Sequence, residues 1–391
     1  MSTQESLPGL LAARSVAVAE SGWGARFRLI QPRNLAFWVY ASLVGYGVLT
    51  ASKAFYLASP VYGGTLLVAA ILFGCYASLL WWLTLRIDRY AHRPRVLIVL
   101  AFLWGAFAAT FTMAARANTP IQSLWAKAFG EAWSIDWGAG LTAPFDEELA
   151  KGAGLVLLIV LAPRLVCTAF DAFVLGAFIG LGFQILEDMQ YAVNAAGAQF
   201  GANPVSNALP TIVLRIGSGI GTHILYSAVF CTGLVYCLGR PTEPPRRVRG
   251  LILMTSAMLL HGVWDDLGGL VGSASALLPI MNVVLIAVAC LVANRAFNLA
   301  VPRERQYMRA VMEPEALSGV ITREELDSLS GDSRARSRYR RARHGHDDKQ
   351  QRRRLLRAAH DLAVELIKSG GRDTTRVAST RNELASARQR G

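Results

Sequence analysis

Charged residues are scarce in this sequence. Only 17% of the 391 residues are Asp, Glu, Lys or Arg, whereas a soluble protein carries about a quarter. Hydrophobic residues make up 53% of the chain, and they gather in runs of about 20, the length that crosses roughly 30 Å of hydrocarbon. This balance argues against an ordinary soluble protein and predicts an all-α, polytopic membrane helix bundle.

The sequence also lacks paired cysteines and an apolar leader. Its five cysteines lie in or beside apolar runs without CxxC spacing, so we expect inert buried thiols and neither a disulfide nor a zinc–thiolate framework. The first 34 residues are polar and contain Arg14, Arg26, Arg28 and Arg33. No apolar segment of the signal-peptide kind precedes these arginines, so we expect no cleaved signal peptide.

What the sequence does contain is a series of apolar runs. We interpret eight of them as membrane spans, because each is long enough to cross the hydrocarbon layer. The sequence therefore predicts a multi-pass membrane protein. The eight runs cover about residues 35–57, 63–85, 96–115, 143–163, 172–196, 211–238, 250–271 and 274–297.

Arginine is unevenly distributed among the segments between these runs. The N-terminal segment and the loops at 86–95 and 239–249 are basic, whereas the loops at 116–142 and 197–210 carry few positive charges. Basic segments remain on the cytoplasmic side of a membrane. We therefore predict that the N and C termini are both cytoplasmic.

Composition divides the chain into three parts. Residues 1–34 are predicted to form a cytoplasmic arm, residues 35–297 a transmembrane domain, and residues 298–391 a basic, partly disordered cytoplasmic tail. The arginines of the tail would fix the topology or attract anionic lipid headgroups. We expect no specific nucleic-acid partner for a tail held beside a membrane.

Ionisable side chains occur inside four of the apolar runs, between about residues 140 and 270. Such residues are costly in hydrocarbon and commonly functional. The run at 143–163 contains Glu147, Glu148 and Lys151, and helical i to i+4 and i to i+3 spacing lets the lysine pair with either carboxylate. Asp146, directly before them, is predicted to be the N-cap of this helix.

The next three runs add further polar side chains. Glu187 lies between Phe183 and Tyr191 at four-residue spacing, so the three share one helix face. The later runs contain Arg215, His223, His261 and Asp265. With a rise of about 1.5 Å per residue, the carboxylates and imidazoles lie roughly 6 to 18 Å from the outer ends of their spans. We therefore predict that they meet in the outer half of the membrane.

Two imidazoles and several carboxylates suit two hydrolytic chemistries. Histidine nitrogen and carboxylate oxygen can hold a metal such as zinc with one position open to water. Alternatively, a buried glutamate acts as general base on a water while the histidines stabilise the oxyanion without a metal. Each group also has a structural interpretation by itself: Glu147, Glu148 and Lys151 as a salt-bridged helix start, and His261 with Asp265 as a mutually satisfied pair.

Four motifs resemble, in order along the chain, those of the PrsW family of intramembrane proteases. That family is related to the CAAX prenyl endopeptidases and the bacteriocin-processing enzymes. The motifs are EE-x-x-K, F-x-x-x-E-x-x-x-Y, R…H and H-x-x-W-D, over about residues 140–270. The resemblance implies a multi-pass peptidase of the bacterial cytoplasmic membrane. It also implies a single-span, anti-sigma-factor-like substrate that is cut on the outer side in regulated proteolysis.

The resemblance implies roles for individual residues. Glu147 and Glu148 would activate the water, and His223 and His261 would bind a metal or stabilise the oxyanion. Glu187 is implied as a further catalytic residue and, with the two histidines, as a ligand if a metal such as Zn²⁺ is required. In the prenyl-peptidase branch a histidine matches Glu187, which leaves the metal question open. Supporting roles fall to Lys151, Asp265, Tyr191 and Arg215.

Two other classes of function compete with the peptidase. A proton- or cation-coupled transporter also uses buried Glu, Asp and His, but the spans show no evident inverted repeat. A non-catalytic scaffold of the same fold would lack a key residue, and none is missing. The sequence therefore favours an intramembrane endopeptidase.

Overall fold

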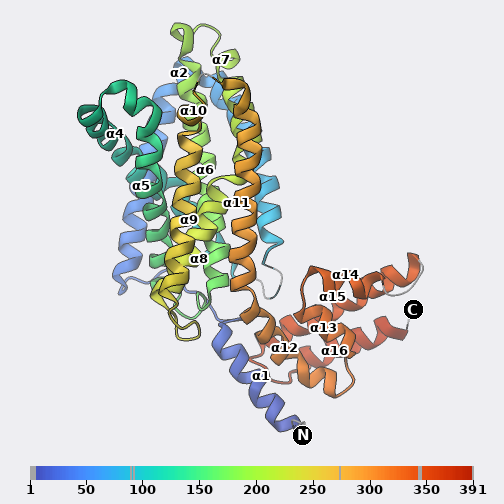
Figure 1. Ribbon diagram of the computed structural model, residues 1–391. Helices are drawn as coiled ribbons and strands as arrows, with labels where there is room; N and C mark the ends of the chain where they lie inside the picture. The colour runs from blue at the N-terminus through green and yellow to red at the C-terminus, as the bar shows by residue number, and fades with distance from the viewer. Residues whose placement is uncertain (1–5, 89, 91–92, 273, 342–345, 390–391) are drawn as a thin grey trace. The chain divides into compact units, whose positions relative to one another are not determined.

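The chain folds into helices. The computed structural model describes residues 6–88, 90, 93–272, 274–341 and 346–389, and over these residues it contains no β-strand. The helices form two compact units (Figure 1). We call the described parts of 28–87 and 94–300 the membrane unit, and the described parts of 1–27, 88–93 and 301–391 the tail unit.

The membrane unit is a helix bundle with α6 at its core. Every residue of α6 from Ala169 to Ile185 is buried. The helices are α2 (Leu35–Leu85), α3 (Arg95–Leu103), the π-helix η1 (Trp104–Ala114), α4 (Ala115–Phe129), α5 (Glu131–Leu161), α6 (Ala169–Ala196), α7 (Pro204–Ser218), α8 (His223–Leu238), α9 (Arg247–Asp265), α10 (Leu267–Val271) and α11 (Leu278–Ala300). Short 3₁₀ turns are η2 (Ala198–Gly201), η3 (Gly219–Gly221) and η4 (Ser275–Leu277).

Five helical segments of the described chain are long and apolar enough to cross a membrane. Six of the eight predicted spans fall on these five segments, because α2 contains the first two. The other two predicted spans fall on α5 and on α9 with α10, which carry ionisable residues. The count of eight spans and the cytoplasmic termini stay predictions. The five segments are Leu35–Leu85, Arg95–Phe129, Ala169–Ala196, Pro204–Leu238 and Leu278–Leu317.

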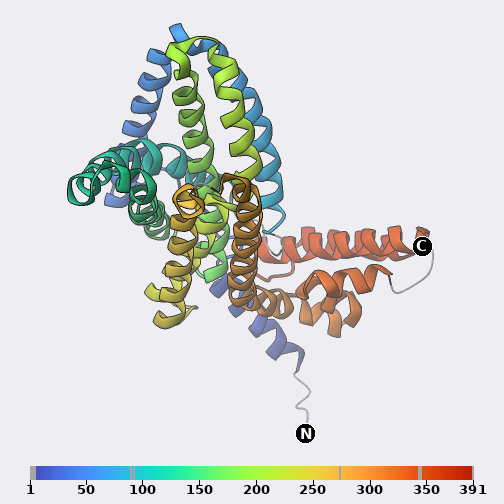
Figure 2. The same cartoon turned by 45° about the horizontal axis from the view of Figure 1, so that its top comes forward.

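A kink divides α2 into two arms. Pro60 lies inside the helix, and Tyr62 has a non-helical backbone with φ −116° and ψ 22°. Proline removes one helical hydrogen bond and its ring clashes with the preceding turn, which explains a bend at this point. The two arms diverge from the bend in both views (Figures 1 and 2). One helical segment therefore supplies the spans predicted at 35–57 and 63–85.

Glycine lets α6 approach its neighbours closely. A Cβ atom at Gly180 would overlap the carbonyl oxygen of His223 on α8, and a Cβ at Gly105 of η1 would overlap that of Ile179 on α6. Larger residues would force these helices apart, because backbone carbonyls cannot yield as a flexible side chain can. The contact at Gly180 therefore seats the start of α8 directly against α6.

The tail unit is helical as well. Its helices are α1 (Leu7–Ser21), α12 (Pro302–Leu317), α13 (Arg323–Ser330), α14 (Ser333–Arg341), α15 (His346–Lys368) and α16 (Thr375–Gln389). They bury an apolar core that includes Met308, Val311, Leu326, Leu362 and Leu384.

This helical tail differs from the partly disordered tail that the composition predicts. On α15, Leu355, Ala359, Leu362 and Leu366 are buried. Their spacing of three and four residues forms one apolar face between exposed arginines. High charge over the whole segment conceals this face, because composition averages the two sides of a helix. Residues 302–341 and 346–389 are therefore largely helical in the described structure, and the division into arm, transmembrane domain and tail stays a prediction.

Candidate active site

Three ionisable side chains of α5 pair with one another inside the bundle. The Nζ atom of Lys151 lies 3.3 Å from Oε2 of Glu147 and 2.9 Å from Oε1 of Glu148, as the helical spacing predicts. The Lys151 ammonium also lies 3.8 Å from the centre of the Phe183 ring, a cation–π contact. The lysine is fully buried, so its charge is balanced entirely by these neighbours.

Asp146 is not the N-cap that the sequence predicts. α5 begins at Glu131, after Gly130 with a φ of 94°, so Asp146 lies well inside the helix. The 116–142 segment resembles a loop in sequence, yet it forms α4 and the first turns of α5. The helix start was misplaced because these turns carry too few apolar residues to extend the predicted span.

His223 is the first residue of α8, after the turn η3 and Thr222. Its Nε2 atom lies 3.0 Å from Oε2 of Glu187 on α6, and its Nδ1 atom lies 2.9 Å from Nζ of Lys151 on α5. The break between α7 and α8 replaces the single helix expected over 211–238. This break places the imidazole between two helices that carry charged side chains.

His261 on α9 lies among three carboxylates. Its Nδ1 atom is 3.2 Å from Oε1 of Glu148, and its Nε2 atom is 3.6 Å from Oε2 of Glu147 and 3.4 Å from Oδ2 of Asp265. The ring stacks on Tyr226 with centroids 5.4 Å apart. Among the described residues, neither nitrogen of His261 nor Oδ2 of Asp265 has a partner with hydrogen-bond geometry. Buried polar atoms without this geometry are rare and costly, so these atoms are candidates to bind a ligand.

Arg215 of α7 connects two neighbouring carboxylates of α6. Its Nη2 atom lies 2.5 Å from Oε2 of Glu187, and its Nε atom bonds to Oδ1 of Asp188. The guanidinium lies 4.3 Å from the centre of the Tyr191 ring. Three residues of α6 thus hold the arginine, and the arginine holds Glu187 beside His223.

One side of the cluster is accessible and the other is sealed. The side chains of Glu187, Arg215 and Asp265 are 14%, 15% and 20% exposed, whereas those of Glu148 and Lys151 are 0% exposed. Glu147, at 3%, contacts groups on both sides. The cluster is therefore least covered by protein on the side of Glu187 and Asp265.

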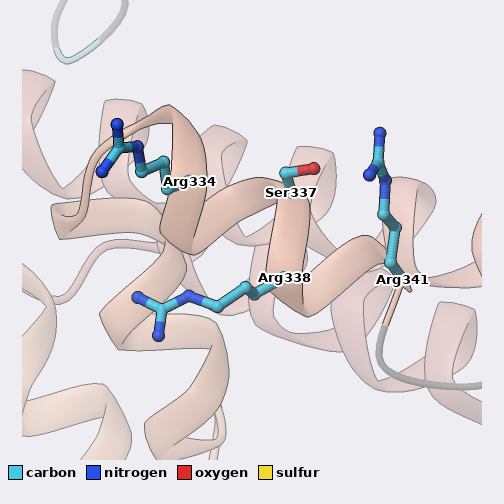
Figure 3. A pocket seen from close by; sticks show the side chains of 4 residues that line it. All are labelled: Arg334, Ser337, Arg338 and Arg341. Atoms are coloured by element: carbon cyan, nitrogen blue, oxygen red, sulfur yellow. The ribbon is translucent and has the colours of Figure 1, made fainter.

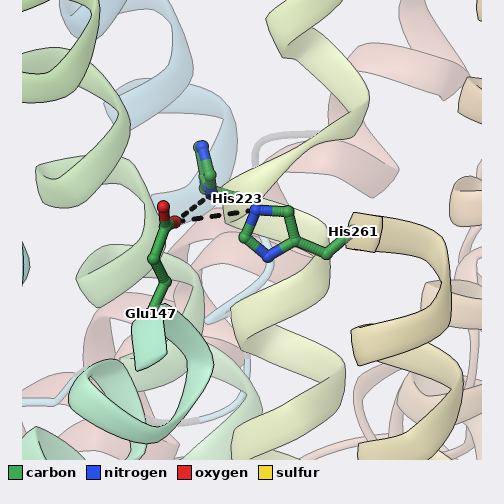
Figure 4. A group of neighbouring side chains, drawn as sticks. All are labelled: Glu147, His223 and His261. Carbon is green, nitrogen blue, oxygen red and sulfur yellow. Dashed lines mark ion pairs between the residues drawn. The ribbon is translucent and has the colours of Figure 1, made fainter. Parts of the chain in front are cut away.

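A compact group of donor atoms lies at the centre. Glu147, His223 and His261 each offer one donor atom, and the three atoms lie within 4.8 Å of one another. Figure 4 shows the three side chains converging from three different helices. Oε2 of Glu147 lies 3.8 Å from Nδ1 of His223 and 3.6 Å from Nε2 of His261.

This donor set could hold a metal ion after a small closing movement, since Oε2 of Glu147 lies 3.6 and 3.8 Å from the two histidine nitrogens. Zinc binds imidazole nitrogen and carboxylate oxygen at about 2.0–2.2 Å, which in a tetrahedron separates neighbouring donors by about 3.3–3.6 Å. Nε2 of His261 is the ring nitrogen that faces Oε2 of Glu147, and it has no partner with hydrogen-bond geometry among the described residues. The group differs in one member from the predicted set of His223, His261 and Glu187. Glu147 takes the place of Glu187, because Glu187 bonds to Arg215 and to the opposite nitrogen of His223.

The structure brings all the predicted site residues together, and their catalytic roles stay predictions. These residues are Glu147, Glu148, Lys151, Glu187, Tyr191, Arg215, His223, His261 and Asp265. The packing of the helices therefore brings these side chains together, as their estimated depths predict.

Sequence reasoning missed three other polar contacts at the site. Asp188 bonds to Arg215, Oγ of Ser227 lies 3.3 Å from Oε2 of Glu148, and the Asn118 amide donates to Oδ2 of Asp146, beside Glu147, at 2.8 Å. Ser227 could have been found, because it follows His223 by four residues on the same helix face. Asn118 has no such signal, since it lies in a segment predicted to be a loop.

The fold and the site together define a helical membrane-type protein with a buried carboxylate–imidazole group suited to a metal. A family model described as PrsW family intramembrane metalloprotease matches residues 93–293, which are 201 of the 391 residues. The matched region contains every residue of the cluster. The chain belongs to the PrsW family, as its motifs suggest. Comparisons with curated proteins and with solved structures gave no match.

Proposed function

We propose that this protein is an intramembrane endopeptidase that hydrolyses a peptide bond of a membrane-anchored protein with an activated water. Membership of the PrsW family supports a protease that acts in the membrane and favours it over a transporter. The observation that carries the proposal is the buried donor group of Glu147, His223 and His261. Two imidazoles and a carboxylate around one point are the groups that water activation requires.

Glu147 is the carboxylate best placed to take a proton from the water. It contacts both histidines and borders the accessible side of the cluster. Glu148 is fully buried and accepts hydrogen bonds from Lys151 and Ser227. We therefore assign it a positioning role, in which it balances the charge of Lys151 and keeps both neighbours in place. In the metal-free scheme, a proton of the water passes to Glu147 as the water oxygen bonds to the scissile carbonyl carbon. Glu147 then protonates the departing amine as the C–N bond breaks.

The histidines face the same point as Glu147. Without a metal, an imidazole N–H at this point would stabilise the oxyanion of the tetrahedral intermediate. Zn²⁺ held by Glu147, His223 and His261 would polarise the scissile carbonyl as a Lewis acid. Metal content distinguishes the two schemes. Purified active enzyme should contain about one zinc per chain, and His261→Ala should lose it; active enzyme without stoichiometric metal would rule out the zinc scheme.

The catalytic proposal is tested by comparing membrane-protein fragments between cells. Cells that produce the wild type and cells that produce the Glu147→Ala, Glu148→Ala variant are compared by mass spectrometry of new peptide ends. A substrate gives a fragment pair that only the wild type produces. A reporter built from that substrate should resist the Glu147→Gln and His223→Ala variants, and unchanged cleavage by either would overturn the catalytic assignment.

We further propose a single-span, anti-sigma-factor-like substrate in the bacterial cytoplasmic membrane, cut on its outer side. The family and the arginine distribution among the loops support this placement. Cysteine labelling tests it, with the native cysteines replaced and Ser123→Cys on α4 compared with Ser333→Cys on α14, both exposed positions. A membrane-impermeant reagent applied to intact cells should label position 123 alone. Labelling of position 333 alone would reverse the orientation.

For the tail we propose attraction to anionic lipid headgroups. Arg334, Arg338 and Arg341 recur at helical spacing on α14 and, with Ser337, line an open pocket (Figure 3). Native mass spectrometry of the full chain in phosphatidylserine and phosphatidylcholine nanodiscs measures retained lipid. Replacing these three arginines by Gln should reduce retained phosphatidylserine. The matched control replaces Arg353, Arg354 and Arg357 on α15, which are also exposed, and an equal loss there would contradict a site on α14.

A further inference from the structure

The Lys151 ammonium lies in a complete hydrogen-bonding environment. It has three N–H groups, and three acceptor atoms surround it: Oε2 of Glu147 at 3.3 Å, Oε1 of Glu148 at 2.9 Å and Nδ1 of His223 at 2.9 Å. The ring of Phe183 covers it at 3.8 Å. The membrane unit therefore contains a buried cation site whose occupant is a side chain of the protein itself.

The contacts of His223 define which of its nitrogens carries the proton. A neutral imidazole has one N–H and one lone pair. Nε2 faces Oε2 of Glu187 at 3.0 Å, and this oxygen also accepts from Arg215, so Glu187 is an ionised acceptor. The proton of His223 is therefore on Nε2, and the lone pair on Nδ1 faces the Lys151 ammonium.

The donor group for a metal uses two of the same atoms. Because Nε2 of His223 carries the proton, a metal at this histidine would bind Nδ1, which lies 3.8 Å from Oε2 of Glu147. Both of these atoms also contact the Lys151 ammonium. A lone pair can accept a hydrogen bond or bind a metal, but it cannot do both. The lysine and a metal therefore exclude one another at His223.

We propose that Lys151 competes with the metal for His223, so that a metal gains His223 as a ligand only when the ammonium moves away. This inference rests on the metal-dependent form of the proposed function. Glu148 remains a partner for the displaced lysine, because the two residues are one helical turn apart on α5. Nε2 of His261 and Oδ2 of Asp265, 3.4 Å apart, remain available for the metal whether or not Lys151 moves.

A double-mutant cycle on metal affinity tests the competition. Full-length protein in nanodiscs is titrated with Zn²⁺ against a chromophoric chelator, and with Co²⁺ by absorption. Lys151→Met should bind zinc about tenfold or more tightly than the wild type, the scale on which groups that contact metal ligands act. In the His223→Ala background the same substitution should give little gain. A gain that is equally large without His223 would show a simple charge effect and overturn the proposal.

A charge-balanced variant guards against misfolding. Lys151→Met leaves Glu148 without its cation, whereas Lys151→Met with Glu148→Gln preserves the net charge of the buried pair. Thermal unfolding shows that each variant is folded before titration. Unchanged or weaker zinc affinity in this folded double variant, or no binding of Zn²⁺ or Co²⁺ in any variant, would also overturn the proposal.

The titration needs no substrate, so its failure is distinct from failure of the proposed function. If the double-mutant cycle shows no coupling between Lys151 and His223 while cleavage depends on Glu147, the peptidase proposal stands and the proposed competition is wrong. If the cycle succeeds while no substrate fragment is found, the competition stands as a property of the site.

Discussion

The buried charges around Glu315 in the tail unit and those around His261 in the membrane unit are satisfied to different degrees. In the tail unit, Arg14 donates to Glu315 at 2.8 Å, and Arg381 donates to both oxygens of Glu315 at 2.7 and 2.8 Å. Arg14 also donates to the carbonyl of Val311. In the membrane unit, both nitrogens of His261 stay without hydrogen-bond geometry among the described residues. We interpret the fully hydrogen-bonded cluster around Glu315 as structural. We interpret the cluster around His261, whose hydrogen bonds are incomplete, as a site for a ligand.

This contrast agrees with the energetics of buried charge. Taking ions out of water is repaid only when their remaining donors and acceptors are bonded. The Glu315 cluster meets this condition and connects helices from both ends of the chain. The cluster around Glu147 meets it only in part, and such exceptions are concentrated at functional sites. Substitutions should therefore affect stability in the tail unit and cleavage in the membrane unit.

The largest expected effect is on catalysis. Glu147→Gln preserves shape but removes the proton acceptor of the metal-free scheme, or a ligand of the zinc scheme, so we expect cleavage of an identified substrate to fall about 10²- to 10⁴-fold. Thermal unfolding should change less than for the loss of a sole counterion, because Lys151 keeps Glu148 as a partner. Normal cleavage by this variant, or a loss of cleavage caused only by unfolding, would contradict a catalytic role for the cluster around Glu147.

The next largest effect is on stability. Glu315→Gln leaves Arg14 and Arg381 without a carboxylate, and removing one partner of a buried ion pair costs about 3–5 kcal/mol. Hydrogen exchange of the full chain should show faster exchange in α1 and α16.

Glu324→Gln is the matched control for this change. The Glu324 side chain is 73% exposed, so we expect at most about 1 kcal/mol. Equal acceleration of exchange in the two variants would contradict a structural role for the Glu315 cluster.

A smaller effect on kcat is expected for Asp188, which contacts the catalytic groups only through Arg215. Asp188→Asn weakens the hold on Arg215, which positions Glu187 beside His223. We expect kcat to fall about 10- to 100-fold with KM nearly unchanged, and Asp188→Glu to restore part of the loss. A change in KM alone would show that Asp188 acts on substrate binding and does not position His223.

The smallest effect concerns a single hydrogen bond. Ser227→Ala removes the 3.3 Å contact with Glu148, which is worth about 0.5–1.5 kcal/mol. We expect a two- to tenfold loss of kcat. Ser256→Ala, whose exposed hydroxyl bonds only within its own helix, should have no measurable effect, and an equal loss there would remove any special role for Ser227.

Local spacing made part of the site predictable. The pairing of Lys151 with Glu147 and Glu148 follows from three- and four-residue separations on one helix, and the structure confirms it. Motif order along the chain predicted the PrsW family, which the family model confirms. These features depend on residues close in sequence or on residue identity, so no knowledge of the packing is needed.

Other features depend on contacts that spacing does not define. The sequence assigned Glu187 to the metal group and treated the segment of Asn118 as a loop. Composition also does not show that α15 buries one face. In each case the outcome depends on which surface of a neighbouring helix a side chain meets.

By itself, the sequence determined a helical membrane-type protein of the PrsW family and the residues of its buried cluster. Run length, residue type and helical period suffice for these conclusions. The tertiary structure alone decided that Glu147 joins the two histidines, that Arg215 holds Glu187, and that Lys151 occupies the lone pair of His223. These arrangements join helices that are distant in the chain, and only their packing brings the side-chain atoms within bonding distance.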